Sequence, residues 1–181
     1  IMFGGTDPNN LTLITLKSIL DLCQIKNIKI NIICGSGYMF LDELKASIIS
    51  CDYDNIILHN SILYVSKVME NSQIAISSNG RSIFELAEMN IPSIIISHHE
   101  REYSHDFSKH ERGFINLGVF NSNSHIDIKN AFIRVTTDSS YWFELYMNLK
   151  KYSFRKNKKN IMNKIYKLIE SNANGDLHEV D

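Results

Sequence analysis

The sequence predicts an α/β protein in which a parallel β-sheet carries helices on both faces. Short apolar runs rich in β-branched residues alternate with longer segments of helical period, which is typical of repeated βα units. The runs KINIIC (29–34) and SIIIS (93–97) are rich in Ile, as parallel strands buried on both faces usually are. Three of the expected strands are followed by glycine-containing loops, and ligands bind at such loops in open parallel sheets.

The expected strands are short apolar runs, and the first of them ends at a glycine pair. We expect strands at Ile1–Phe3, Lys29–Cys34, Asn55–His59, Ile74–Ser77, Ser93–Ser97 and Phe114–Leu117. The segments between them have apolar residues at helical spacing. We expect helices at Leu11–Cys23, Phe40–Ile49, Leu63–Asn71, Ser82–Met89 and Tyr103–Glu111. Together these elements predict a Rossmann-like sheet.

The pattern changes after Gly118, where no further strand is expected. Ile126–Val135 has the spacing of a helix, and Tyr141–Glu170 has that of one or two longer amphipathic helices that close the fold. The polar stretch 172–181 is expected to be a disordered tail. We therefore expect a single domain over residues 1–171, near the usual length of roughly 100–200 residues.

Composition and charge exclude several classes of protein. Hydrophobic residues make up 44% of the chain and charged residues 22%, which indicates a globular protein and not a disordered or fibrous one. No apolar run reaches the ~20 residues of a membrane span, and the first residues lack the features of a secretory signal. The three cysteines suggest a reducing compartment, so we expect a cytoplasmic protein. A net charge of −1 argues against a surface built to bind nucleic acid.

Positive charge is concentrated in one segment near the C-terminal end. Residues 150–167 contain eight Lys and Arg residues and no acid. One interpretation is a solvated helix face. The other is attachment to an anionic partner, such as peripheral contact with a membrane surface. Both interpretations fit the sequence.

The first glycine loop, FGGTDPNNLT, follows the first expected strand. Gly4 and Gly5 let the backbone approach a ligand, because glycine has no Cβ. Thr6 or Asp7 is expected to cap a helix that begins at Pro8. Capping explains Asp7 and Pro8 but does not require two glycines. The glycine pair fits contact with a ligand and a simple turn equally well.

The second loop contains Gly35, Ser36 and Gly37. In a dinucleotide-binding G-x-G-x-x-G motif the third glycine would stand at Phe40, so a nicotinamide or flavin site is not expected, and a turn explains the pair. A P-loop is also absent, because no G-K-[ST] follows any glycine run, and there is no G-x-S-x-G nucleophile elbow. We expect no cofactor.

The third loop, SSNGRSIFEL, joins an expected strand to an expected helix. Backbone N–H groups at the start of this helix, with the helix dipole, favour an anion, and Arg81 adds positive charge there. A phosphate site competes with an ordinary helix start, because Ser82 and Glu85 form the S-x-x-E pattern of a capping box. On spacing alone the two interpretations are equal.

Four histidines, His98, His99, His105 and His110, follow the fifth expected strand. A zinc-binding H-E-x-x-H motif that starts at His99 would need histidine where Tyr103 stands. His105 and His110 are five positions apart and therefore share a helix face poorly. We expect no metal, and contacts to a bound sugar or phosphate are the better functional interpretation. At least His110 is expected to be an ordinary surface residue.

Several blocks of the sequence resemble, in order, the blocks of a known family. FGGTDPNNLTLITL, CGSGYMFLDELK, VMENSQIAISSNGRSIFELAEMNIPSIII and FINLG are similar to successive parts of the C-terminal half of GT-B nucleotide-sugar proteins. The resemblance is strongest to the UDP-sugar hydrolases of pseudaminic acid biosynthesis and to the related spore-coat polysaccharide proteins. It covers residues 1 to about 118 and implies one half of a GT-B fold.

The resemblance implies a binding site for a UDP-sugar. In this family the C-terminal half holds the nucleotide, and the loop matching Ser78–Ser82 meets the phosphates. Glu85 matches the acid that accepts hydrogen bonds from the ribose hydroxyls, and His59–Ile62 matches the region whose backbone reads uracil. Ser104 and His105 match sugar contacts of related transferases, which have paired amides there. The implied nucleotide-sugar-binding residues are Gly4, Gly5, Thr6, His59, Ile62, Ser78, Asn79, Gly80, Arg81, Ser82, Glu85, Ser104 and His105.

The catalytic histidine of these hydrolases belongs to an N-terminal half, and nothing in this chain corresponds to it. The chain begins at Ile1, within an expected strand, and so resembles one half of a two-domain enzyme whose cleft would be lined by Gly4, Gly5 and Thr6. The implied function is to bind a UDP-sugar for hydrolysis of the sugar–diphosphate bond, in surface polysaccharide or nonulosonic sugar biosynthesis. The alternatives are the donor domain of a glycosyltransferase and a noncatalytic nucleotide-sugar-binding module appended to a sugar-activating enzyme.

Overall fold

The computed structural model describes the backbone of residues 1–152 and 154–175. It describes the side chains of residues 1–152 and 159–170. Most of the stretch 172–181, which the sequence predicts to be disordered, therefore lies outside the described residues.

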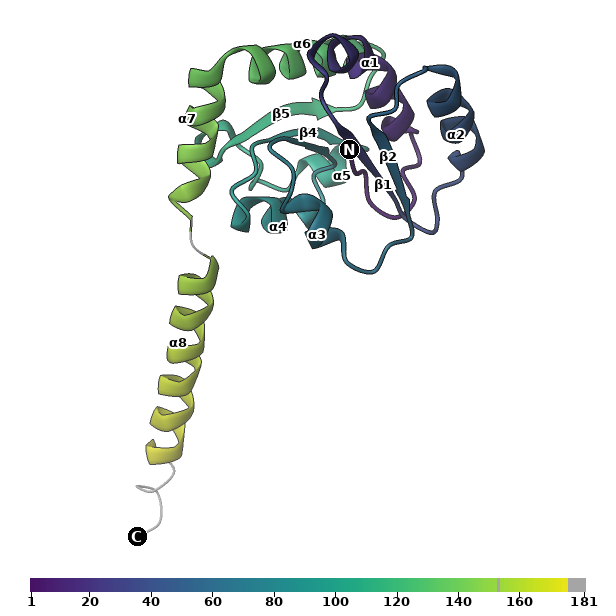
Figure 1. The fold of residues 1–181 in the computed structure, drawn as a ribbon. Coiled ribbons are helices and arrows are strands. Elements are labelled where there is room, and N and C mark those ends of the chain that lie inside the picture. The colour runs from purple at the N-terminus through teal and green to yellow at the C-terminus, as the bar shows by residue number, and fades with distance from the viewer. Residues whose placement is uncertain (153, 176–181) are drawn as a thin grey trace. The chain divides into compact units, whose positions relative to one another are not determined.

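Contacts divide the chain into two units, Ile1–Lys151 and Tyr152–Asp181. The first unit is a mixed α/β structure with parallel strands and helices on both sides of them (Figure 1), which confirms the predicted fold class. Among its described residues, the second contains one helix. None of the described helices is long and apolar enough to span a membrane.

The sheet is parallel, and its centre is the segment that begins the chain. β1 (Ile30–Cys34) pairs with β2 (Ile56–Asn60), and β4 (Ser93–Ser97) pairs with β3 (Ala75–Ser77) and β5 (Phe114–Val119). Met2 joins the two groups, because it forms parallel bridges with Ile33 of β1 and Ser77 of β3. The strand order is therefore β2, β1, Met2, β3, β4, β5. The predicted strand Ile1–Phe3 is reduced to this bridge, and the other strand predictions are confirmed.

Helices connect the strands and complete the chain. They are α1 (Leu11–Lys26), α2 (Leu41–Ser50), α3 (Val65–Met69), α4 (Ser82–Glu88), α5 (Glu100–Tyr103), α6 (Ser124–Thr137), α7 (Ser139–Lys150) and α8 (Phe154–Gly175). The helix predictions that correspond to α1–α4 and α6 are confirmed, with boundaries that differ by a few residues. The long C-terminal prediction corresponds to two helices, α7 and α8.

The predicted helix Tyr103–Glu111 is wrong. α5 ends at Tyr103, and further along only a 3-10 turn forms, at His110–Arg112. Between them the chain is held by a side chain from β5, since Asn116 Nδ2 donates to the carbonyl oxygen of Ser108 over 3.1 Å and to its hydroxyl over 2.8 Å. A tertiary contact thus overrides the helical pattern of the local sequence.

Two apolar clusters lie on opposite faces of the sheet. Ile32 of β1 belongs to the larger cluster, with α1, α2 and α6, whereas its neighbour Ile33 packs against the smaller one. Successive residues of a strand point to opposite faces of the sheet, so the two clusters lie on opposite faces. The smaller cluster contains Met2, Met69 of α3 and Leu86 of α4. Figure 1 shows the same arrangement, with α1 and α6 on one side of the strands and α3 and α4 on the other.

The strand order reverses at the first segment. The chain passes from Met2 outward to β1 and β2 and then returns to the other side of Met2 for β3, β4 and β5. Ligands of open parallel sheets bind outside the carboxyl ends of the strands at such a reversal. The topology therefore directs the search for a site to the loops that follow Met2 and β3.

Candidate functional site

A cavity of about 410 Å³ opens where the strand order reverses. The loops after the first segment, after β1 and after β2 form its walls, together with α3 and α4. Its lining residues are Met2, Gly4, Gly5, Ile33, Cys34, Gly35, Ser36, Ser61, Ile62, Val65, Met69, Ser82 and Glu85. The cavity therefore lies where a parallel α/β sheet is expected to hold its ligand.

The cavity brings together five of the residues that the family resemblance implies. Gly4 and Gly5 come from the first glycine loop, Ile62 from the loop after β2, and Ser82 and Glu85 from α4. The implied residues outside its lining are Thr6, His59, Ser78, Asn79, Gly80, Arg81, Ser104 and His105. The structure thus gathers the predicted glycine pair and the predicted carboxylate, but the predicted sugar contacts and all of the predicted phosphate loop except Ser82 lie outside the lining.

The second glycine loop packs backbone against backbone on the first. A Cβ on Gly35 would lie 2.5 Å from the Cα of Gly5, and the N–H of Gly37 donates to the carbonyl of Gly5 over 3.1 Å. Gly35 is therefore required for the close approach of two loops, and a turn alone does not explain it. The sequence offered no signal for Cys34 and Ser36 in the cavity lining beyond their place at the end of a strand.

Asp7 caps α1 from a position before the helix. Its carboxylate oxygens accept from the N–H groups of Leu11 and Thr12, each over 2.8 Å, and its side chain is buried. The predicted helix start at Pro8 is wrong, since α1 begins at Leu11. Nε2 of His98 lies 3.9 Å from Oδ1 of Asp7. Asp7 is therefore occupied by the helix and by His98, and it is not a ligand group of the cavity.

α4 begins without a capping box. Ser82 is its first residue, Arg81 holds the N-cap position, and no side chain caps the helix. The side chains of Arg81, Ser82 and Glu85 make no hydrogen bond or ion pair with any described residue. Of the two interpretations that the sequence leaves open, the helix cap is therefore absent. The Glu85 carboxylate is exposed at the cavity and available to a ligand.

The backbone supplies donors around the cavity. In the described part of the chain, the N–H groups of Gly80, Arg81 and Ser82 donate to no other group, nor do those of Gly4 and Gly5. Clusters of such N–H groups suit anions, phosphate among them. Gly4, Gly5 and Ser82 carry theirs at the cavity lining.

Asn79 does not offer its side chain to the cavity. It is fully buried, and its Nδ2 donates to the carbonyl oxygens of Glu102 over 2.9 Å and of His105 over 3.1 Å. The Nδ1 of His105 lies 2.8 Å from the carbonyl oxygen of Asn79, and Oε2 of Glu102 accepts from the N–H of His98 over 2.6 Å. Ser78, the preceding residue, is also buried. Asn79 therefore fastens the loop after β3 to the segment around α5.

The other implied residues lie outside the cavity for separate reasons. His59 is in β2, where its Nε2 lies 3.1 Å from Oδ1 of Asn31. The hydroxyl of Ser104 donates to the carbonyl of Arg101 over 2.7 Å. Thr6 is exposed at the end of the first glycine loop. The hydroxyl of Ser104, a predicted sugar contact, thus has a partner within the chain. The uracil contact around His59 is expected from the backbone and stays a prediction.

The electrostatic character of the cavity is weakly acidic. Among the described residues of its lining, Glu85 is the one that carries a charge. Burial raises the pKa of Cys34 to about 11, with a contribution from the Asp7 carboxylate, so this thiol is neutral near pH 7. The described residues contain no group of three or more His, Cys, Asp or Glu side chains that could hold a metal ion. A single carboxylate suits hydroxyl groups, and an anion would have to lie toward the glycine loops.

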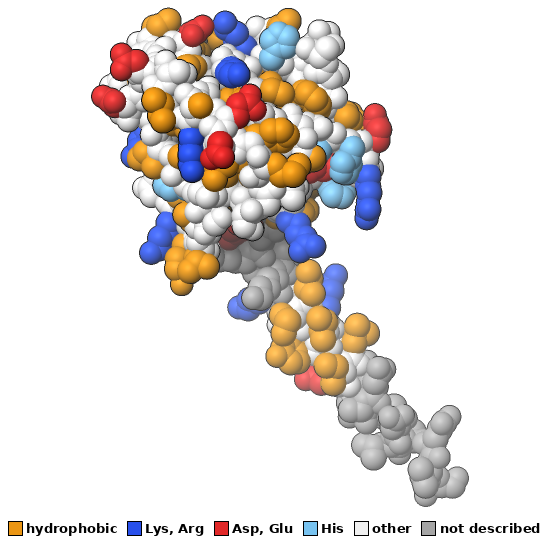
Figure 2. Space-filling view, turned by 90° about the vertical axis from the view of Figure 1, so that its right-hand side faces the viewer, with side chains coloured by type: hydrophobic (Ala, Val, Ile, Leu, Met, Phe, Trp, Pro, Cys, Tyr) orange, Lys and Arg blue, Asp and Glu red, His pale blue; other side chains and the backbone are white. Residues whose placement is uncertain are grey.

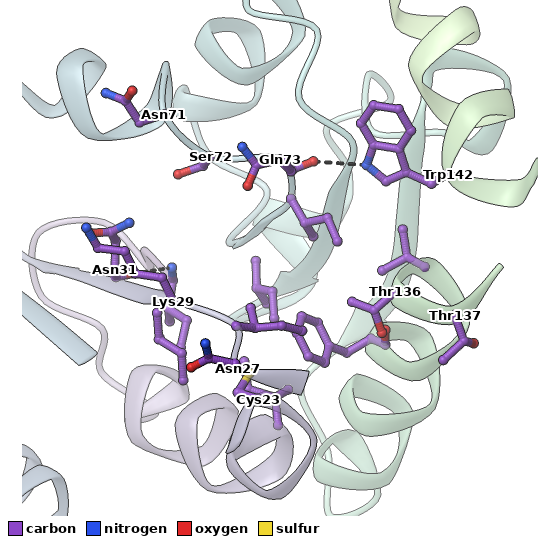
Figure 3. A pocket seen from close by; sticks show the side chains of 18 of the residues that line it. Cys23, Asn27, Lys29, Asn31, Asn71, Ser72, Gln73, Thr136, Thr137 and Trp142 are labelled. Carbon is purple, nitrogen blue, oxygen red and sulfur yellow. Dashed lines mark hydrogen bonds between the residues drawn. The ribbon is translucent and has the colours of Figure 1, made fainter. Parts of the chain in front are cut away.

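A larger cavity, of about 620 Å³, lies toward the amino ends of the strands (Figure 3). Apolar and polar side chains share its lining, and Nε1 of Trp142 donates to the carbonyl of Gln73 over 3.0 Å at its border. None of the glycine loops contributes to its lining. Because ligands of parallel sheets bind at the opposite ends of the strands, the smaller cavity is the candidate site.

Comparison with known proteins adds a homologue. No protein-family profile and no solved structure matches the chain. The chain is similar to the uncharacterized protein MJ1062 of Methanocaldococcus jannaschii, with 30% identity over 112 residues. The match covers 60% of this chain and 23% of the archaeal protein, so the chain spans much less than the length of this relative. The chain is therefore similar to part of a longer protein, and this similarity says nothing about activity.

Proposed function

We propose that the chain is the UDP-sugar-binding domain of a cytoplasmic enzyme that makes a surface polysaccharide or a nonulosonic sugar. One observation carries the proposal. At the reversal of strand order, a cavity joins the backbone of Gly4 and Gly5 to the carboxylate of Glu85, which has no partner among the described residues. These groups stand in loops that resemble the nucleotide-binding loops of GT-B proteins.

The ribose, the diphosphate and the base of a UDP-sugar would each have a chemically suitable group at the cavity. The Glu85 carboxylate would accept hydrogen bonds from the ribose hydroxyls, because an ionised carboxylate only accepts. The diphosphate would lie toward the N–H groups of Gly4 and Gly5, away from the negative charge of Glu85. Ile62, which is half-buried at the cavity, would give the base an apolar contact. A nucleoside diphosphate would thus meet Glu85 with its hydroxyl groups and the backbone N–H groups of the first glycine loop with its charge.

The proposed reaction is hydrolysis of the sugar–diphosphate bond. A base in an N-terminal partner domain would take a proton from water, the water oxygen would attack the anomeric carbon, and the diphosphate would leave with the bonding electrons. The backbone N–H groups of Gly4 and Gly5 would stabilise the charge on the leaving diphosphate. The length of the archaeal relative supports a larger protein of which this domain is one part.

Two other functions use the same donor site. In a glycosyltransferase, an acceptor hydroxyl takes the place of water. In a noncatalytic module appended to a sugar-activating enzyme, no base faces the cavity. The partner domain distinguishes the three, because a histidine in a glycine-rich loop there favours the hydrolase.

Nucleotide binding tests the proposal directly. Ligand-observed NMR with UDP, CDP, GDP and their sugars should show binding with a preference for UDP. Glu85→Gln should weaken the binding of UDP roughly tenfold or more, because it removes a hydrogen bond to a charged acceptor, worth about 1.5–3 kcal/mol. Glu111→Gln, which removes a charge from an exposed residue outside the cavity, should have no effect.

Two results would contradict the proposal. One is that no nucleotide binds to the folded chain. The other is that Glu85→Gln binds UDP as tightly as the original chain does, because Glu85 would then not serve the ribose.

A further inference from the structure

α8 carries an apolar stripe. Between residues 159 and 170 its hydrophobic side chains are each at least 40% exposed: Ile161, Met162, Ile165, Tyr166, Leu168 and Ile169. At about 100° per residue, they fall within roughly 160° of the helix circumference. Figure 2 shows hydrophobic side chains gathered along this helix. A stripe of this width is typical of a helix that buries one side against an apolar medium.

The rest of the helix surface is basic. Lys164 and Lys167 lie outside the stripe, Lys159 stands at its border, and Glu170 is the single acid between residues 159 and 170. The excess of positive charge extends toward the N-terminus of the helix, because residues 150–167 contain eight basic residues and no acid. The partner of this helix must therefore accept both apolar side chains and a high density of positive charge.

We propose that α8 binds in the plane of an anionic lipid surface. Its apolar stripe would enter the boundary between headgroups and acyl chains, and its lysines would meet the negative headgroups. The helix would lie on the bilayer and not cross it, since no described helix is long and apolar enough to span one. This inference rests on α8 alone and is independent of nucleotide binding.

The positive charge of α8 favours a lipid surface over a second copy of the chain, and its apolar stripe favours a lipid surface over nucleic acid. Pairing of α8 with a second copy would bring two lysine-rich helices together with almost no acid to compensate, and like charges repel. Nucleic acid would match the charge but not the exposed apolar stripe. An anionic membrane matches both.

Vesicle binding by the full chain tests the proposal. The chain should co-sediment with vesicles of phosphatidylcholine and phosphatidylserine at low salt, and binding should fall at high salt and with phosphatidylcholine alone. Ile161→Gln with Ile165→Gln should weaken binding on the order of 100-fold, because two buried isoleucines are lost while the charge is kept. Lys164→Gln with Lys167→Gln should weaken it roughly 30-fold, from about 1 kcal/mol for each lysine.

A charge-matched control isolates the contribution of α8. Lys26→Gln with Lys45→Gln removes the same charge from exposed positions on α1 and α2, and it should leave vesicle binding almost unchanged. Circular dichroism should show equal helix content in all variants, since glutamine is a good helix former.

Three results would overturn the proposal. The first is no binding to anionic vesicles at low salt, which is expected if the stripe packs against protein, including the rest of this chain. The second is binding that the isoleucine substitutions leave unchanged, which indicates a purely electrostatic attachment. The third is a dimer in solution that these substitutions dissociate, which assigns the stripe to a second copy of the chain.

Discussion

The amide of Asn79 holds together two loops at the carboxyl edge of the sheet. Its Nδ2 donates to the carbonyl oxygens of Glu102 and His105, while its Oδ1 is buried without a hydrogen-bond partner among the described residues. The position requires a donor, so an amide serves where a carboxylate would not. Asn79 thus positions the loop that precedes Glu85 without lining the cavity itself.

Asn79→Ala should lower the free energy of unfolding by about 1–2 kcal/mol. Two hydrogen bonds are lost, although removal of the unpaired Oδ1 offsets part of this cost. Urea unfolding measures the loss, and hydrogen exchange should become faster at residues 99–105, which the amide fastens. Asn130→Ala, at an exposed position of α6, is the matched control and should change stability by less than about 0.5 kcal/mol. Equal stability of the two variants would show that the amide does not hold the loops.

Glu85 illustrates how far a single residue can be interpreted from sequence. Its distance from Ser82 matches a capping box, and its place after a glycine loop matches a ribose contact. Sequence spacing is the same in both cases, so it cannot separate them. The structure removes the cap interpretation, because α4 begins at Ser82 and no described side chain caps it, and the ribose contact stays a prediction.

Two elements of the carboxyl edge, the first and the second glycine loop, pack against each other as one unit. Gly35 and Gly5 come from loops that follow different strands, and their backbones touch at a distance that leaves no room for a Cβ on Gly35. A Cβ on Gly5, in contrast, would meet nothing within 4 Å. The two glycines therefore have different reasons to be glycine: close packing at Gly35 and open access to the cavity at Gly5.

These reasons predict opposite behaviour for two alanine variants. Gly35→Ala should destabilise the chain by about 1–3 kcal/mol, because the backbone of one loop must move. Gly5→Ala should keep its stability within about 0.5 kcal/mol but weaken UDP binding, since the new methyl group enters the cavity. Thermal unfolding and ligand-observed NMR measure the two effects. A stable Gly35→Ala variant would contradict the packing argument, and unchanged UDP binding by Gly5→Ala would contradict the placement of the ligand.

The elements that the sequence predicted correctly are those defined by local periodicity. Ser93–Ser97 is an isoleucine run, and it is a fully buried strand. The failures occur where distant side chains determine the backbone. Asn116 holds the segment near Ser108 in place of a helix, and Asp7 caps a helix that begins later than Pro8 suggests. No local pattern contains these partners.

At the scale of the whole molecule, two buried thiols couple stability to pH. Cys23 and Cys34 belong to the larger apolar cluster, and burial is the main cause that raises the pKa of each to about 11. An unfolded cysteine titrates near pH 8.5. The folded state therefore keeps both thiols protonated in a range where the unfolded state loses its protons.

The stabilising effect of the neutral thiols is complete below about pH 8.5 and is lost as pH rises toward about 11. We expect the free energy of unfolding to fall through this window by on the order of 1 kcal/mol per pH unit for each thiol. Urea unfolding at several pH values measures the slope. Cys23→Ala with Cys34→Ala should be less stable near neutral pH, because buried side-chain atoms are lost, but the slope should be shallower. An unchanged slope would show that other groups cause the loss.

The alternation of strands and helices, the parallel α/β class and the glycine loops can be predicted from the sequence, because hydrophobic period and glycine chemistry are local properties of the chain. The position of Met2 at the centre of the sheet, and the cavity that Gly4, Ile62 and Glu85 line together, became visible in the folded chain. The use of the Asn79 amide inside the protein became visible there as well. The physical reason is that strand order and side-chain partners depend on contacts between residues far apart in the sequence, which local periodicity does not encode.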